Sequence, residues 1–202
     1  MKTIFILSLL CMQLFSASLE HVTLNNYDFS IVKEKYDVYD SKGEVLKLYK
    51  EEQNRNLTFI LRFTLSDHTG GCAAKGMTEG SYEISDDGNI TFYTLWTRQG
   101  KAYLASYGAR VQTYRLSDNG KLELLEGKIY IEETKRNHDN DSGMEYLFHT
   151  PKSKEEKEKL QSYVKTVEEK YKATFVFEEE SKNLIKEVKK ALKRKTKAIW
   201  TR

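Results

Sequence analysis

The sequence Tyr82-Glu-Ile-Ser-Asp-Asp-Gly-Asn-Ile-Thr-Phe92 recurs as Tyr114-Arg-Leu-Ser-Asp-Asn-Gly-Lys-Leu-Glu-Leu124, so the middle of the chain repeats one structural unit. Asp87-Gly88 and Asn119-Gly120 are residue pairs that tolerate positive φ in tight hairpin turns. The apolar and aromatic residues on either side of each pair suit a pleated, half-buried surface. Each copy is therefore predicted to be a β-hairpin, and a chain that repeats hairpins builds an antiparallel barrel or sandwich.

A succession of strands and short turns is predicted around this repeat. The clearest strand is 57–65, where apolar and polar residues alternate with the period of two that one buried face requires. The glycine-rich stretch 66–79 interrupts this pattern and is predicted to be a loop, and Ser41-Lys42-Gly43 is predicted to be the turn of the first hairpin. About eight strands joined by short turns favour an up-and-down meander. The remaining predicted strands are 31–39, 44–50, 81–85, 90–96, 102–116, 122–133 and 145–149.

The chain changes character after Thr150-Pro151. Ser153 and Glu156 have the spacing of a capping box and predict the start of a helix. A short strand is predicted at 173–178, and a second helix from about Ser181. The fold class is therefore mainly β with C-terminal helices, in the order barrel, helix, short strand, helix. The apolar face of the first helix consists of Leu160, Tyr163, Val164, Val167 and Tyr171.

This order of elements resembles the lipocalin and calycin architecture, in which an eight-stranded antiparallel barrel is followed by a helix packed on its wall and a further short strand. The resemblance covers residues 26–178 and concerns the succession of elements. The family's Gly-x-Trp motif near the first strand is missing, because Trp96 and Trp200 are the only tryptophans. No family binding residue is therefore carried over, but the resemblance implies a barrel that encloses a small ligand.

The N-terminus has the pattern of a secretory signal. Lys2 precedes an apolar run at 4–15, and Ser16-Ala17-Ser18 offers small residues for a signal peptidase. We expect a signal peptide at 1–18, a barrel at 19–150 and a helical segment at 151–202. The apolar run is shorter than the roughly 20 residues of a membrane span. With cleavage after Ser18, Cys72 is the only cysteine left, which suits a secreted or periplasmic bacterial protein without a disulfide.

Aromatic residues on the predicted strands are the candidates for a ligand-binding wall. In the predicted strand 102–116, large residues alternate with small ones along one face, and a neighbouring strand places two aromatics beside it. An eight-stranded barrel holds one small ligand or is filled by its own side chains. The alternative is accordingly that these aromatics fill the core. The candidate ligand-binding residues are Phe59, Phe63, Phe92, Trp96, Tyr103 and Tyr107.

Catalytic and metal chemistry find little support in the sequence. His68 and Cys72 are the sharpest chemical candidates, with His68 as a base for the thiol, but a shielded thiol near a surface histidine is the simpler interpretation. Zinc requires more ligands than this segment offers. Asp87 and Asp118 are interpreted as turn formers. We therefore expect no enzyme activity, no metal and no cofactor.

The last helix is strongly basic, with Glu187 as the only acid after Lys182. A basic amphipathic helix binds anionic membranes or polyanions, or simply presents its lysines to water. Nucleic acid is not an expected partner of an exported protein. The sequence thus predicts a monomeric, exported carrier of a small hydrophobic or amphipathic molecule. The alternative is a cell-envelope interaction module with a filled barrel, which binds an anionic lipid or a partner protein through this helix.

Overall fold

The structure is a computed structural model that describes residues 18–24, 26–54, 56–71, 74–100, 104–117, 121–136, 144–148 and 154–200. Strands form most of it and two helices follow near the C-terminus, so the predicted class, mainly β with C-terminal helices, is confirmed. The predicted signal peptide lies outside the described residues except for Ser18. The elements are β1 (Ser18–Leu24), β2 (Tyr27–Val38), β3 (Ser41–Glu51), β4 (Leu57–Gly70), β5 (Ala74–Ile84), β6 (Asn89–Gly100), β7 (Leu104–Leu116), β8 (Leu122–Arg136), β9 (Met144–Phe148), α2 (Lys154–Tyr171), β10 (Thr174–Phe175) and α3 (Glu178–Trp200).

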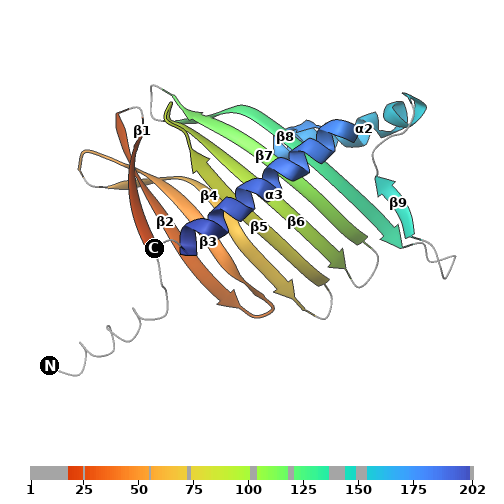
Figure 1. Cartoon of the computed structure of the whole chain (residues 1–202), viewed down its shortest axis with the longest axis horizontal. Coiled ribbons are helices and arrows are strands. Elements are labelled where there is room, and N and C mark those ends of the chain that lie inside the picture. Colours follow the sequence, from red (N-terminus) through yellow and green to blue (C-terminus); the bar gives the residue numbers. More distant parts are fainter. Residues whose placement is uncertain are drawn as a thin grey trace.

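The strands form a single sheet with two open ends (Figure 1). Its order is β1-β2-β3-β4-β5-β6-β7-β8-β10, with β9 also paired to β8. All pairs are antiparallel except β8 and β10, which run parallel. The prediction of a closed barrel is wrong. Closure would require β1 to pair with the far edge of β8, but β9 and β10 already occupy that edge.

One predicted loop and one predicted turn form strands in the structure instead. Residues 66–79 were expected to be a loop, yet β4 continues to Gly70 and β5 begins at Ala74, with Ser66 paired to Glu79 and Gly70 to Lys75. Except for Met77, the residues of these pairs are polar or glycine, so the apolar alternation that marks a strand is absent. Ser41-Lys42-Gly43 lies inside β3, because the turn is one step earlier, where Tyr39 has a φ of 51°.

The first copy of the repeated sequence forms the predicted hairpin between β5 and β6. Gly88 has a φ of 79°, in the left-handed region that favours glycine, and the Ser85 amide donates to the Asn89 carbonyl over 3.0 Å. In the second copy, Asn119 and Gly120 lie outside the described residues. The strands on either side are paired there as well, Leu116 with Leu122. Both hairpin predictions are therefore confirmed at the level of strand pairing.

The N-terminal strands fold over one end of the C-terminal strands. β4 and β5 pair only between 66–70 and 75–79, so the rest of β4 is free to diverge from β5. On the C-terminal side, Tyr82 donates a hydrogen bond to Glu20 of β1 over 3.2 Å. This first core joins both halves of the sheet, and its buried members are Leu24, Phe29, Ile31, Leu46, Leu48, Phe63, Leu65, Ile90 and Phe92.

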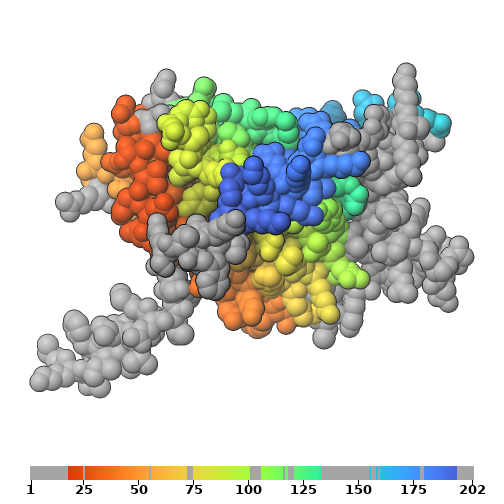
Figure 2. Space-filling view, viewed as in Figure 1, coloured from red at the N-terminus to blue at the C-terminus, as the bar shows by residue number. Residues whose placement is uncertain are grey.

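Helix α3 crosses one face of the sheet diagonally and covers β5 to β8 (Figures 1 and 2). We call this face the α3 face; it consists of Tyr93, Leu95, Ala109 and Tyr130, against which Leu184, Val188 and Ala191 are buried.

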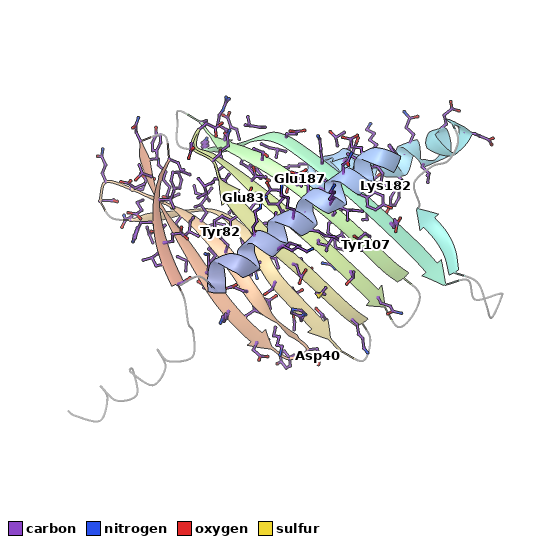
Figure 3. The ribbon with its side chains drawn as sticks, viewed as in Figure 1. Asp40, Tyr82, Glu83, Tyr107, Lys182 and Glu187 are labelled. Carbon is purple, nitrogen blue, oxygen red and sulfur yellow. The ribbon has the colours of Figure 1, made fainter. Side chains whose placement is uncertain are left out.

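Polar contacts fix the helix on this face. Glu83, which is labelled beside α3 in Figure 3, accepts a hydrogen bond from Tyr93 over 3.0 Å and pairs with Arg194 at 2.8 Å. Burial, together with the hydrogen bond to Glu83, raises the pKa of Tyr93 to about 12. The tyrosine therefore remains a neutral hydrogen-bond donor across the physiological range. No helix in the described part of the chain is long and apolar enough to cross a bilayer.

Helix α2 covers part of the opposite face, which we call the α2 face and which consists of Phe92, Trp96, Ile129 and Ile131. All five residues of the predicted apolar face of this helix pack here, which confirms that prediction. Their neighbours include the residues that follow the helix: the Phe175 amide donates to Glu168 over 2.8 Å. Ser153, the predicted helix cap, lies outside the described residues. The α2 face thus has a second core, separate from the first.

Leu184→Ala tests the docking of α3. Leu184 is buried on the α3 face, so truncation should lower the free energy of unfolding by about 2–5 kcal/mol. Lys186→Ala changes an exposed residue two positions further along α3 and should alter the free energy of unfolding by no more than about 0.5 kcal/mol. Chemical denaturation of the two variants measures the difference. Equal effects would show that α3 is not held through its apolar side.

Candidate functional site

A cavity of about 440 Å³ lies on the α2 face, between the two cores. Its position follows from the register of β6: Phe92 belongs to the first core, Trp96 belongs to the second, and Thr94 lies between them. Strand β4 and the C-terminal turn of α2 form the other walls. The residues that line it are Arg62, Phe63, Thr64, Asp67, Thr78, Thr94, Trp96, Arg98, Ser106, Arg110, Lys170 and Tyr171.

Trp96 forms the wall nearest to α2. Its indole N–H donates to the Ser106 hydroxyl over 3.3 Å, and its ring stacks on Tyr171 with 6.2 Å between ring centres and an interplanar angle of 20°. The ring occupies the space above Gly108, its partner on β7, where a Cβ atom would lie 2.0 Å from the indole. Glycine is therefore required at 108 for the tryptophan to adopt this position.

Tyr171 is held at the end of α2 by its backbone and its ring. Its carbonyl accepts a hydrogen bond from the Gln112 side chain over 3.0 Å, which ties the helix end to β7. The Arg110 guanidinium lies over the tyrosine ring, 5.6 Å from its centre, and Lys170 approaches the ring at 5.2 Å. Cations over aromatic rings are attracted by the ring quadrupole. The site therefore combines aromatic walls with cationic side chains.

The electrostatic character of the cavity is basic. Three arginines and Lys170 line it, against Asp67 as the one acid among its described lining residues. Asp67 accepts hydrogen bonds from Tyr36 over 2.6 Å and from Ser41 over 2.7 Å. Burial raises the pKa of Asp67, but these hydrogen bonds and the charge of Arg98 outweigh it, so the pKa lies below its ordinary value. Asp67 is therefore ionised at neutral pH and is already bound by two hydroxyl donors.

The predicted ligand-binding residues divide between three environments. Phe63 and Trp96 line the cavity, and Phe92 lies beside Phe63 in the first core, with 4.5 Å between ring centres. Phe59 is 54% exposed and meets Tyr49 edge-on outside the cavity. Tyr103 lies outside the described residues. Of the five predicted residues that the structure describes, Phe63 and Trp96 therefore reach the cavity.

A β-bulge explains why Phe59 and Phe63 separate. Leu48 pairs with Leu61 and the next residue, Tyr49, pairs with Phe59, so one extra residue of β4 is inserted between the two pairs. An inserted residue shifts the alternation of faces along a strand. The period-two pattern that joined Phe59 to Phe63 in the sequence is thus broken in the structure.

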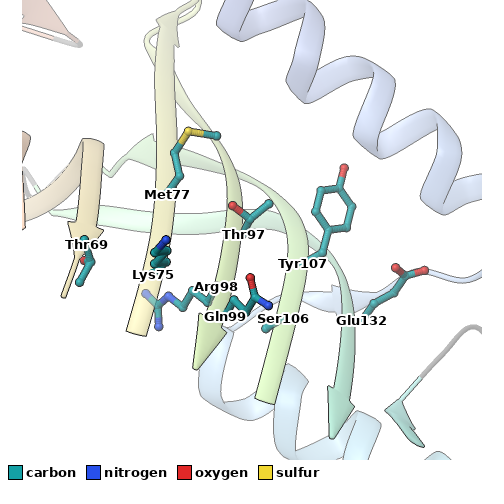
Figure 4. Close-up of a pocket in the computed structure, with 11 residues that line it drawn as sticks. Thr69, Lys75, Met77, Thr97, Arg98, Gln99, Ser106, Tyr107 and Glu132 are labelled. Atoms are coloured by element: carbon teal, nitrogen blue, oxygen red, sulfur yellow. The ribbon is translucent and has the colours of Figure 1, made fainter. Parts of the chain in front are cut away.

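Tyr107 lies on the α3 face, opposite to Trp96. It pairs with Thr97, whereas Trp96 pairs with Gly108, and side chains of adjacent residues in a strand point to opposite faces. With Met77, Thr97 and Glu132 it lines a groove of about 650 Å³ beside α3 (Figure 4). The expected joint wall of Trp96 and Tyr107 does not form.

The arginines of the cavity were missed from the sequence. Arg98 follows Trp96 at the two-residue spacing of one strand face, and Arg110 follows Gly108 in the same way. That spacing is the signal that links the arginines to Trp96. A charged residue on a strand is normally assigned to the solvent side. The folding of β4 and α2 over this face, which the local pattern does not contain, turns it into a cavity wall.

The other chemical candidates do not form a site in the described residues. His68 is exposed, and Cys72 lies outside the described residues. Within the described ranges, no three histidine, cysteine or acidic residues are grouped so that they could hold a metal ion. No protein-family model, curated protein or solved structure matches the chain. The resemblance to lipocalins therefore stays a prediction.

Gly108→Ala tests the wall formed by Trp96. The new methyl group overlaps the indole, so we expect a loss of about 1–3 kcal/mol in the free energy of unfolding and a shift in Trp96 fluorescence. The measurement uses a Trp200→Phe background, in which Trp96 is the only tryptophan. Gly76→Ala is the control, because its Cβ meets nothing closer than 3.5 Å. An unchanged spectrum in Gly108→Ala would contradict this placement of Trp96.

Proposed function

We propose that the chain is an exported bacterial binding protein that holds one small amphipathic molecule in the cavity between its two cores. The observation that carries the proposal is the cavity itself, which is lined by both aromatic rings and cationic groups. Its volume lies in the range of about 300–1,000 Å³ that is typical of small-molecule sites. Export rests on the signal pattern at 1–18 and leads to the periplasm or the cell exterior.

Binding without chemistry fits the lining residues. The cavity's described walls contain no histidine or cysteine, and the Oδ1 atom of Asp67 accepts hydrogen bonds from two hydroxyl groups. General base catalysis needs a group that is free to take a proton from a substrate. The walls offer surfaces and hydrogen-bond donors instead, as a carrier requires, and the proposal includes no cofactor.

Native mass spectrometry of the protein purified from its own compartment tests the carrier function. We expect a bound small molecule, and roughly 3- to 10-fold weaker binding in Tyr171→Ala and Trp96→Ala, because each removes an aromatic wall. Tyr171→Ala changes a residue at a helix end, which limits the risk of unfolding. Phe59→Ala, an exposed aromatic outside the cavity, should bind normally. An empty protein that also binds no apolar dye would overturn the proposal.

A second candidate function is supported by the outer surface of α3. Its outward lysines are exposed, and Glu180 pairs with Lys128 of β8 rather than with a lysine of the helix, at 3.8 Å. The apolar side of α3 is buried on the sheet, so the helix cannot insert this side into a bilayer. Contact with an anionic envelope surface would be electrostatic only. The exposed lysines of the helix are Lys182, Lys186, Lys189, Lys190 and Lys193.

Vesicle flotation tests this alternative. Each lysine near an anionic surface contributes about 1 kcal/mol, so reversing Lys186, Lys189 and Lys190 to Glu should abolish any binding to anionic vesicles at low salt. The control reverses the same number of exposed lysines on the sheet: Lys35, Lys42 and Lys75. The alternative fails if the unmodified protein does not float with anionic vesicles at low salt, or if both triple variants bind equally.

A further inference from the structure

Two polar side chains face each other across neighbouring strands in the middle of the cavity. Thr94 of β6 pairs with Arg110 of β7, and both line the cavity. Thr94 is 6% exposed, and its hydroxyl has no hydrogen-bond partner among the described residues. A buried hydroxyl without a partner is unfavourable, since its bonds to water are lost and not replaced. A ligand atom that accepts a hydrogen bond from Thr94 removes this penalty.

No residue in the described part of the chain supplies a counter-charge to Arg110. Among the described residues no carboxylate lies within 4.0 Å of its guanidinium, which lies over the ring of Tyr171, 5.6 Å from the ring centre. Burial lowers the pKa of Arg110, yet an arginine stays charged at neutral pH. A guanidinium carries five N–H donors in a fork that matches an oxyanion. The site therefore offers a partly desolvated cation with several donors on the strand next to Thr94.

The surroundings of this pair exclude a cationic ligand group. Arg62 and Arg98, both exposed, line the cavity on its solvent side, and Lys170 lies beside Tyr171. Asp67 carries one negative charge and interacts with Arg98, which leaves an excess of positive charge among the described lining residues. The field inside the cavity is positive, and a planar or tetrahedral oxyanion matches an arginine fork through paired hydrogen bonds.

Building on the proposed function, we propose that the bound molecule carries an oxyanion, a carboxylate or a phosphate. Arg110 and Thr94 bind this group. Trp96, Phe63 and Tyr171 contact the apolar part of the molecule. Arg62 and Arg98 then act at the entrance, where they attract the anion before it reaches Arg110.

A matched pair of fluorescent probes separates the charge from the apolar body. Anilinonaphthalene sulfonate and N-phenylnaphthylamine share nearly the same aromatic body, but only the first has an anionic group, which stands in for the oxyanion. We expect Arg110→Met to lower the affinity for the sulfonate probe about 10-fold or more. The affinity for the neutral probe should fall less than about threefold. Arg115→Met, an exposed arginine on the same strand, should change neither affinity.

Thr94→Val provides a second test that does not depend on the arginine. Valine has the same shape but lacks the hydroxyl, so the free protein should be at least as stable as the unmodified one. Binding of the sulfonate probe should nevertheless weaken about 3-fold or more, since a donor to the anion is lost. A residue with a purely structural role would not give this combination. Thr97→Val, on the same strand and exposed, is the control.

Displacement of the sulfonate probe identifies the kind of oxyanion. Decanoate, decyl phosphate and decanol have similar alkyl chains and differ in the head group. If decanoate displaces the probe at the lower concentration, the natural group is a carboxylate; if decyl phosphate does, it is a phosphate. The oxyanion proposal is overturned if decanol displaces the probe at the same concentration as the two anions and Arg110→Met lowers the affinities for both probes equally. The carrier function would still stand in that case. If none of these compounds and neither probe binds, both proposals fail together.

Discussion

An open β-sheet has two faces, and each apolar face must be covered by another element. In this protein α3 covers one face of β5 to β8 along its length. The opposite face is covered twice, by α2 at one end and by the N-terminal strands at the other. Among the described residues the two covers form separate cores, and the cavity lies between these cores. Its existence follows from the way in which the sheet buries its second face.

Successive side chains on one face of β6 belong in turn to the first core, the cavity and the second core. Phe92, Thr94 and Trp96 lie on the same face at successive two-residue steps, yet they belong to the first core, the cavity and the second core. A sheet that had only to fold would be expected to carry an apolar residue at 94, because an unpaired buried hydroxyl is destabilising. The strand pairing of Thr94 with Arg110 places this hydroxyl next to a partly buried cation. Sites that break the rules of stable packing in this way are where function is expected.

The sequence predicted the local elements better than their assembly. Hairpins, most strands and the apolar side of α2 follow from turn residues and periodicity, which are local signals. The polar pairs between 66–70 and 75–79 carry no such signal, and whether the sheet closes depends on which strand occupies the edge of β8. Within the site, Phe63 and Trp96 were predictable as large aromatics on strands. The bulge at Phe59 and the covering of Arg110 by Tyr171 depend on contacts between distant segments.

The position of the cavity would also link the proposed binding to the arrangement of the two halves of the sheet. Arg62 and Phe63 come from β4 in the N-terminal half, whereas Arg110 and Tyr171 come from the C-terminal half. Direct pairing between these halves is confined to one end of β4 and β5. A molecule that contacts both walls at once adds a connection where the backbone has none. Because a ligand stabilises the state that binds it, occupancy favours the one arrangement in which both walls face the cavity.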